Sequence, residues 1–94
     1  MNKLDKKRLS IDLIDEQMTN LFEQRMNIVK DIALYKKENN LPIFNEEREK
    51  VLINKNLSFL KSEEFKSYYL EFINKVLSLS KEYQNELTKN ESKK

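Results

Sequence analysis

Apolar residues recur every three or four positions through the first third of this 94-residue chain. Written as heptads, they fill the a and d positions of one continuous helix; they are Ile11, Ile14, Met18, Leu21, Ile28, Ile32 and Tyr35. The repeat predicts a helix from about Asp5 to Lys37, roughly 50 Å long at about 1.5 Å per residue. A chain of 94 residues is expected to form one small domain. In such a domain, two shorter helices cannot cover both sides of so long a helix. We therefore expect a partner chain, with two copies of the helix packed along their apolar seams.

The sequence contains no glycine and a single proline, Pro42. Tight turns are harder to form without glycine, so long helices with few connections are expected. Pro42 disfavours helix at the residue before it, and the helical pattern breaks over the segment 38–42, after the first helix. Asn45 then has the side chain of a good N-cap and predicts a second helix over about 46–56.

A third helix is predicted to begin at Ser62, another good N-cap, which two acidic residues follow. Its apolar stripe continues to about Thr88, and the segment 89–94 has the composition of a polar tail. The predicted fold class is therefore all-α, with one long N-terminal helix and two shorter ones. We expect a single domain over 1–94, of which about 4–88 is structured.

The chain has no histidine and no cysteine. Their absence excludes disulfides, thiol nucleophiles, zinc–cysteine sites and imidazole acid–base chemistry, and we expect neither a metal nor a cofactor. The 18 basic and 16 acidic residues are interleaved and give a net charge of +2, so no nucleic-acid partner is expected. No apolar stretch has the length of a membrane span or the form of a signal peptide. We therefore expect no membrane partner and a cytoplasmic location.

Arg25 falls at an a position of the apolar seam. A guanidinium there either reaches to water or a glutamate, or it awaits an anionic ligand, because a buried cation needs an anion. Lys36 lies eleven residues further on, on nearly the same face and about 16 Å away along the axis. Together, these two side chains could hold a small dianion. Arg8 lies about 25 Å from Arg25, so it reaches such a ligand only from an antiparallel partner helix, and otherwise is a solvated surface residue.

The second and third helices also carry polar side chains on their apolar faces. Glu49 shares a face with Leu52 and is expected to point inward, whereas Arg48 and Glu49 taken as a solvated pair need no further explanation. Ser80 and Gln84, one turn apart, continue the apolar stripe of the third helix. A helical serine often bonds its own backbone, but an inward glutamine amide needs partners.

These residues, in this order and at these spacings, resemble the all-helical (AroQ-type) chorismate mutases from about Leu4 to Gln84. The pattern has five parts: Arg8; Ile14-Asp15-Glu16 with Leu21-Phe22-Glu23-Gln24-Arg25; Ile32-Ala33-Leu34-Tyr35-Lys36; Pro42 to Glu49; and Ser80-Lys81-Glu82-Tyr83-Gln84. The resemblance implies an intertwined homodimer with two equivalent sites. It also implies the Claisen rearrangement of chorismate to prephenate, on the route to phenylalanine and tyrosine.

Carried over by position, two residues are implied to be catalytic. Lys36 would bind a substrate carboxylate and the ether oxygen of the breaking bond, and Gln84 would donate to the same ether oxygen. Arg25 and the partner subunit's Arg8 would bind carboxylates. This chemistry needs no nucleophile, metal or general base, which agrees with the residue inventory.

The remaining implied substrate-binding residues come from the second and third helices. Glu49 would accept a hydrogen bond from the ring hydroxyl, Ser80 would assist at a carboxylate, and Arg48 would support the site. Asn45 stands where the family usually has aspartate. If this position meets the hydroxyl through its backbone, the asparagine is harmless; if the carboxylate itself matters, turnover should suffer.

Two alternative functions stay open at this point. Isochorismate-pyruvate lyases have a similar fold and share the basic residues, although Glu49 and the pair Ser80 and Gln84 are more typical of a mutase. The second alternative is a non-catalytic helical dimerisation module, in which Arg25 sets the register of a coiled coil.

Overall fold

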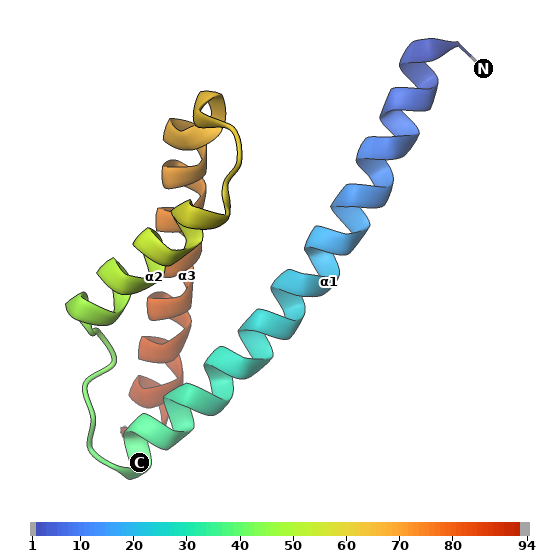
Figure 1. Ribbon diagram of the computed structural model, residues 1–94. Coiled ribbons are helices and arrows are strands. Elements are labelled where there is room, and N and C mark those ends of the chain that lie inside the picture. The colour runs from blue at the N-terminus through green and yellow to red at the C-terminus, as the bar shows by residue number, and fades with distance from the viewer. Residues whose placement is uncertain (1, 93–94) are drawn as a thin grey trace.

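The computed structural model describes residues 2–92, and they form three α-helices and one short 3₁₀ turn. In chain order these elements are α1 (Lys3–Glu38), α2 (Glu46–Phe59), η1 (Glu63–Phe65) and α3 (Lys66–Ser92) (Figure 1). No strand occurs in this range, so the predicted all-α class with one long and two shorter helices is confirmed. Within the same range, no helix is both long and apolar enough to cross a membrane.

The ends of α1 are set by asparagines. The side chain of Asn2 accepts a hydrogen bond from the backbone N–H of Asp5 at 2.8 Å. At the other end Asn40 has a φ of 56°, the left-handed conformation that glycine usually supplies. The N–H of Leu41 then donates to the carbonyl of Lys36 at 2.8 Å, and the N–H of Asn40 donates to Lys37 at 3.3 Å. This pair of bonds is a Schellman motif, so asparagine closes the helix in a chain without glycine.

The start of α2 agrees with the sequence, but its end does not. The Oδ1 atom of Asn45 accepts from the N–H of Arg48 at 3.0 Å, which confirms the predicted N-cap. The helix continues to Phe59 instead of ending at about Asn56. No proline or glycine interrupts those added residues, and the helix ends where Leu60 becomes extended.

The third helix begins later and ends later than predicted. Ser62 precedes the 3₁₀ turn η1, and its side chain makes no capping hydrogen bond. The α-helix proper starts at Lys66 and runs to Ser92, so most of the expected polar tail is helical. Residues 93–94 of that tail lie outside the described range.

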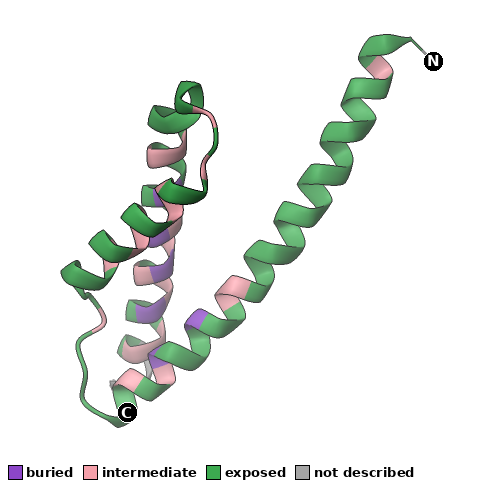
Figure 2. Ribbon diagram, viewed as in Figure 1, coloured by how far each residue is buried: buried purple, intermediate pink, exposed green. Residues whose placement is uncertain are grey.

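The core lies where the C-terminal half of α1 meets α3, while α3 also packs against α2 (Figure 2). Its buried apolar side chains are Val29 and Ala33 from α1 and Ile73 and Leu77 from α3. Ser80 and Gln84 are also buried, so the prediction that these two polar residues face inward is confirmed. The N-terminal half of α1 stands clear of the other helices (Figure 1).

The apolar seam of α1 is uncovered along this free half. Ile11 and Leu21, at its two ends, are 54% and 62% exposed. The chain of 11.4 kDa has an accessible surface of 8007 Å², against about 5,800 Å² for a compact monomer of that mass. Its radius of gyration is 17.1 Å, against about 12 Å for a compact chain of this length. As the sequence predicted, one chain cannot cover its own long helix.

Candidate active site

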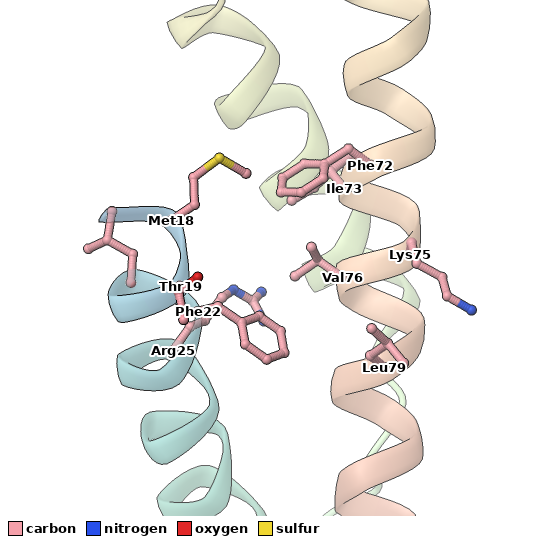
Figure 3. Close-up of a pocket in the computed structure, with 10 residues that line it drawn as sticks. Met18, Thr19, Phe22, Arg25, Phe72, Ile73, Lys75, Val76 and Leu79 are labelled. Carbon is pink, nitrogen blue, oxygen red and sulfur yellow. The ribbon is translucent and has the colours of Figure 1, made fainter. Parts of the chain in front are cut away.

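An open groove of about 540 Å³ separates α1 from α3 beside the core. Its lining is mostly apolar and consists of Met18, Thr19, Leu21, Phe22, Arg25, Phe72, Ile73, Lys75, Val76 and Leu79 (Figure 3). Two of these residues are cations. Lys75 points away from α1, whereas the guanidinium of Arg25 lies between the two helices (Figure 3). Arg25 is thus the charged group that α1 presents to the groove.

Arg25 is half-buried and is held by a neutral partner. Its Nη1 atom donates to the hydroxyl oxygen of Ser80 at 2.7 Å. That hydroxyl in turn donates to the carbonyl of Val76 at 2.8 Å, so its lone pairs face the guanidinium. Among the described residues no carboxylate pairs with Arg25. The cation is therefore fixed in position while its charge is uncompensated, which suits an anionic ligand.

Gln84 lies one turn beyond Ser80 on α3 and is buried. Its Nε2 atom donates to the backbone carbonyl of Ser80 at 3.3 Å, which uses one of two N–H groups. Its Oε1 atom is buried with no hydrogen-bond partner among the described residues. A buried, unsatisfied acceptor costs about 1–3 kcal/mol. The amide therefore has both a donor and an acceptor available for a ligand.

Lys36 occupies the last turns of α1 and is also half-buried. Its Nζ atom donates to the backbone carbonyl of Ile43 at 2.8 Å, which ties the segment between α1 and α2 to α1. An ammonium group has three donors, so two are still available. Within the described part of the chain no carboxylate pairs with it.

Glu49 on α2 is half-buried, as predicted, and it faces a residue to which the sequence analysis gave no role. Nζ of Lys81 lies 3.2 Å from one carboxylate oxygen and 3.4 Å from the other. Nζ also lies 4.5 Å from the centre of the Phe44 ring. One signal for Lys81 was present in the sequence: it precedes Gln84 by three residues, so the two are neighbours on the helix surface.

The other predicted site residues are exposed. Arg48 and Asn45 lie at the start of α2, where the Asn45 side chain is engaged as the N-cap. Arg8 is exposed on the free half of α1, about 25 Å along the helix axis from Arg25. The structure therefore brings Arg25 and Gln84 to Ser80, and Glu49 to the neighbouring Lys81. It does not bring Arg8 of the same chain to them.

Comparisons with known proteins identify the family of the chain. The chain belongs to the chorismate mutase type II family, whose model matches residues 7–85. It is also similar to a solved structure, a conserved hypothetical protein from Pyrococcus furiosus. The two are 33% identical with a TM-score of 0.72, over 89% of this chain and 97% of that one. No curated protein matches the chain.

The capping bond of Asn45 generates a prediction about stability. Asn45→Ala removes the acceptor for the Arg48 N–H and should lower the free energy of unfolding by about 1 kcal/mol. Asn45→Asp keeps an equally good cap and should leave it unchanged. Urea unfolding followed by circular dichroism, at one fixed chain concentration, measures both. Equal stability of the alanine and asparagine proteins would show that the cap contributes nothing.

Proposed function

We propose that this protein is a chorismate mutase, which rearranges chorismate to prephenate. The observation that carries the proposal is the half-buried guanidinium of Arg25, which lacks a carboxylate partner and is bonded to Ser80, one turn from the buried amide of Gln84. In a family of type II chorismate mutases, an uncompensated cation beside a buried amide supports binding of a carboxylate of the substrate. The place in phenylalanine and tyrosine synthesis stays a prediction from the resemblance, and the cytoplasmic location stays a prediction from the sequence.

The reaction suits a site without acid–base groups. The ether C–O bond of chorismate breaks while a new C–C bond forms, and no proton is transferred. The protein must therefore hold the compact, chair-like conformer. It must also place donors where the ether oxygen gains negative charge in the transition state.

The donors at the ether oxygen come from α1 and α3. Lys36 has two N–H groups beyond the one bonded to Ile43, and we assign them to the ether oxygen and a carboxylate. Gln84 has one N–H beyond that bonded to Ser80, and we assign it to the same ether oxygen. Both groups are held in position before substrate arrives, which is how donors lower a barrier most effectively.

The other assignments follow from the partners that each side chain already has. Arg25 binds one carboxylate. Ser80 positions Arg25, since its own proton is engaged with Val76. Glu49 accepts from the ring hydroxyl, and Asn45 contributes through its backbone because its side chain caps α2.

Arg48 lies in the first turn of α2 and precedes Glu49 in the sequence. Its side chain is exposed, and we assign it a supporting role near Glu49.

We further propose that the protein acts as an intertwined homodimer. The exposed seam of α1 and the apolar groove between α1 and α3 are the two apolar surfaces that a second copy would cover. Covering them would also remove the excess accessible surface of the single chain. Packed against a second chain, the free half of α1 would carry Arg8 to the site of the partner, where it would bind the second carboxylate.

The decisive experiment compares the wild-type protein with Arg25→Ala. We expect the wild type to consume chorismate and form prephenate, followed by the loss of chorismate absorbance. Arg25→Ala should lower kcat/KM on the order of 10²–10³-fold, because a preorganised charged contact is lost. Lys30→Ala, an exposed cation of the same helix, serves as the matched control and should stay within about twofold of wild type, since surface substitutions rarely perturb a site.

The same preparations distinguish the alternatives. Pyruvate release from isochorismate, with no prephenate from chorismate, would identify a lyase. No turnover of either compound, together with an Arg25→Leu dimer that is more stable than wild type, would identify a dimerisation module.

Gln84 generates a prediction about pH. The amide carries no titratable proton, so the wild-type rate should not depend on its ionisation. In Gln84→Glu the new carboxyl group can donate to the ether oxygen only when it is protonated, so activity should rise as the pH falls. Rates of chorismate loss between pH 4.5 and 8 test this. If the profile of Gln84→Glu is as flat as that of the wild type, Gln84 does not contact the ether oxygen.

Mixing two inactive variants tests the contribution of Arg8 across the dimer. Arg8→Ala and Arg25→Ala should each be inactive as homodimers. When they are unfolded together and refolded at equal concentrations, half of the dimers are mixed, and each mixed dimer has one intact site. Activity should therefore recover to about a quarter of the wild-type value. If Arg8 served the site of its own chain, every mixed dimer would have two damaged sites, and nothing would recover.

A further inference from the structure

The ion pair between Lys81 and Glu49 is less exposed than the pair between Lys50 and Glu46. Lys81 and Glu49 are 34% and 23% exposed at their side chains, whereas Lys50 and Glu46 are 63% and 69% exposed. An exposed pair such as Lys50 and Glu46 contributes little to stability. In the first pair each charge is partly removed from water, so the loss of one partner leaves the other uncompensated.

Lys81 also connects α3 to the segment between α1 and α2. Its Nζ atom lies 4.5 Å from the centre of the Phe44 ring, which is the geometry of a cation–π contact. Phe44 directly follows Ile43, whose carbonyl accepts the hydrogen bond from Lys36. One side chain thus touches both Glu49 and the segment that fixes Lys36.

Glu49 presents an electrostatic difficulty in the proposed function. A carboxylate beside the site repels a substrate that carries two negative charges, yet it is the group assigned to accept from the ring hydroxyl. An ammonium at 3.2 Å offsets that charge. A carboxylate has about four lone-pair positions on two oxygens, so it can accept from Lys81 and from a hydroxyl at once.

We propose that Lys81 is a positioning residue of this site, an inference that rests on the proposed function. It orients the Glu49 carboxylate toward the substrate hydroxyl and offsets its charge, so that the dianion can bind. Lys81 itself does not contact the reacting atoms. It acts through Glu49, and its removal therefore affects substrate binding more than the rearrangement.

The test is a double-mutant cycle in chorismate turnover with Lys81→Met, Glu49→Gln and the combination. Lys81→Met should raise KM about tenfold, the effect of losing one charge-assisted contact, with kcat changed less than about threefold. Lys81→Arg replaces the ammonium with a guanidinium of the same charge and should stay within about threefold of wild type, because a cation still offsets the Glu49 charge. In the Glu49→Gln background, Lys81→Met should have no further effect, because no charge is left to offset or orient.

The matched control is Lys50→Met, which removes the exposed pair with Glu46 by the same substitution. It should leave kcat and KM unchanged within about twofold. Circular dichroism and dimer mass are measured for each variant, so that kinetic effects are compared among folded proteins.

Three results would overturn the inference. If Lys81→Met raises KM equally in both backgrounds, Lys81 acts independently of Glu49. If Lys81→Met lowers kcat as strongly as it raises KM, Lys81 does not act mainly on substrate binding. If Lys81→Arg is as impaired as Lys81→Met, offsetting the Glu49 charge is not its role. These failures require an active wild type, so they differ from failure of the proposed function, in which the wild type leaves chorismate unchanged and the role of Lys81 is refuted with it.

Discussion

The hydrogen bond from Arg25 to Ser80 joins α1 to α3 where buried apolar and buried polar side chains adjoin. Beyond Arg25 on α1, Val29 and Ala33 continue the same face as Arg25, and both are buried. On α3 the buried face that carries Ile73 and Leu77 continues with Ser80 and Gln84, which are also buried. The apolar residues fix the separation of the two helices, and this separation lets the guanidinium reach the hydroxyl at 2.7 Å. A neutral partner holds the cation without cancelling its charge, so the packing of the core prepares an anion site.

The features that were predictable from the sequence depend on neighbours within a few residues. The heptad repeat gave the course of α1, Pro42 gave the break after it, and Asn45 gave the start of α2, because caps and periodicity act locally. The inward direction of Ser80 and Gln84 followed from the same periodicity.

The missed features depend on conformations or contacts that no local pattern specifies. Asn40 takes the left-handed conformation that glycine usually adopts. Ser62 precedes a 3₁₀ turn without forming a side-chain cap. The pair of Lys81 and Glu49 spans 32 positions of the chain. The spacing of three residues from Gln84 was a signal for Lys81, but its pairing with Glu49 arises only when α2 packs against α3.

The balance of charge explains how the side chains of the proposed site suit a dianionic substrate. Arg25 and Lys36 are cations with no carboxylate partner among the described residues, while the charge of Glu49 is offset by Lys81. Asn45, at a position where the family usually has aspartate, caps α2 without adding a negative charge. The groups of one chain that face the proposed ligand therefore carry two uncompensated positive charges.

An acidic residue at position 45, or the absence of Lys81, would reduce that excess of positive charge. The contribution of Arg8 from a second chain would increase it. The asparagine and the lysine thus act in the same direction, and both strengthen the attraction between the site and a molecule with two carboxylates.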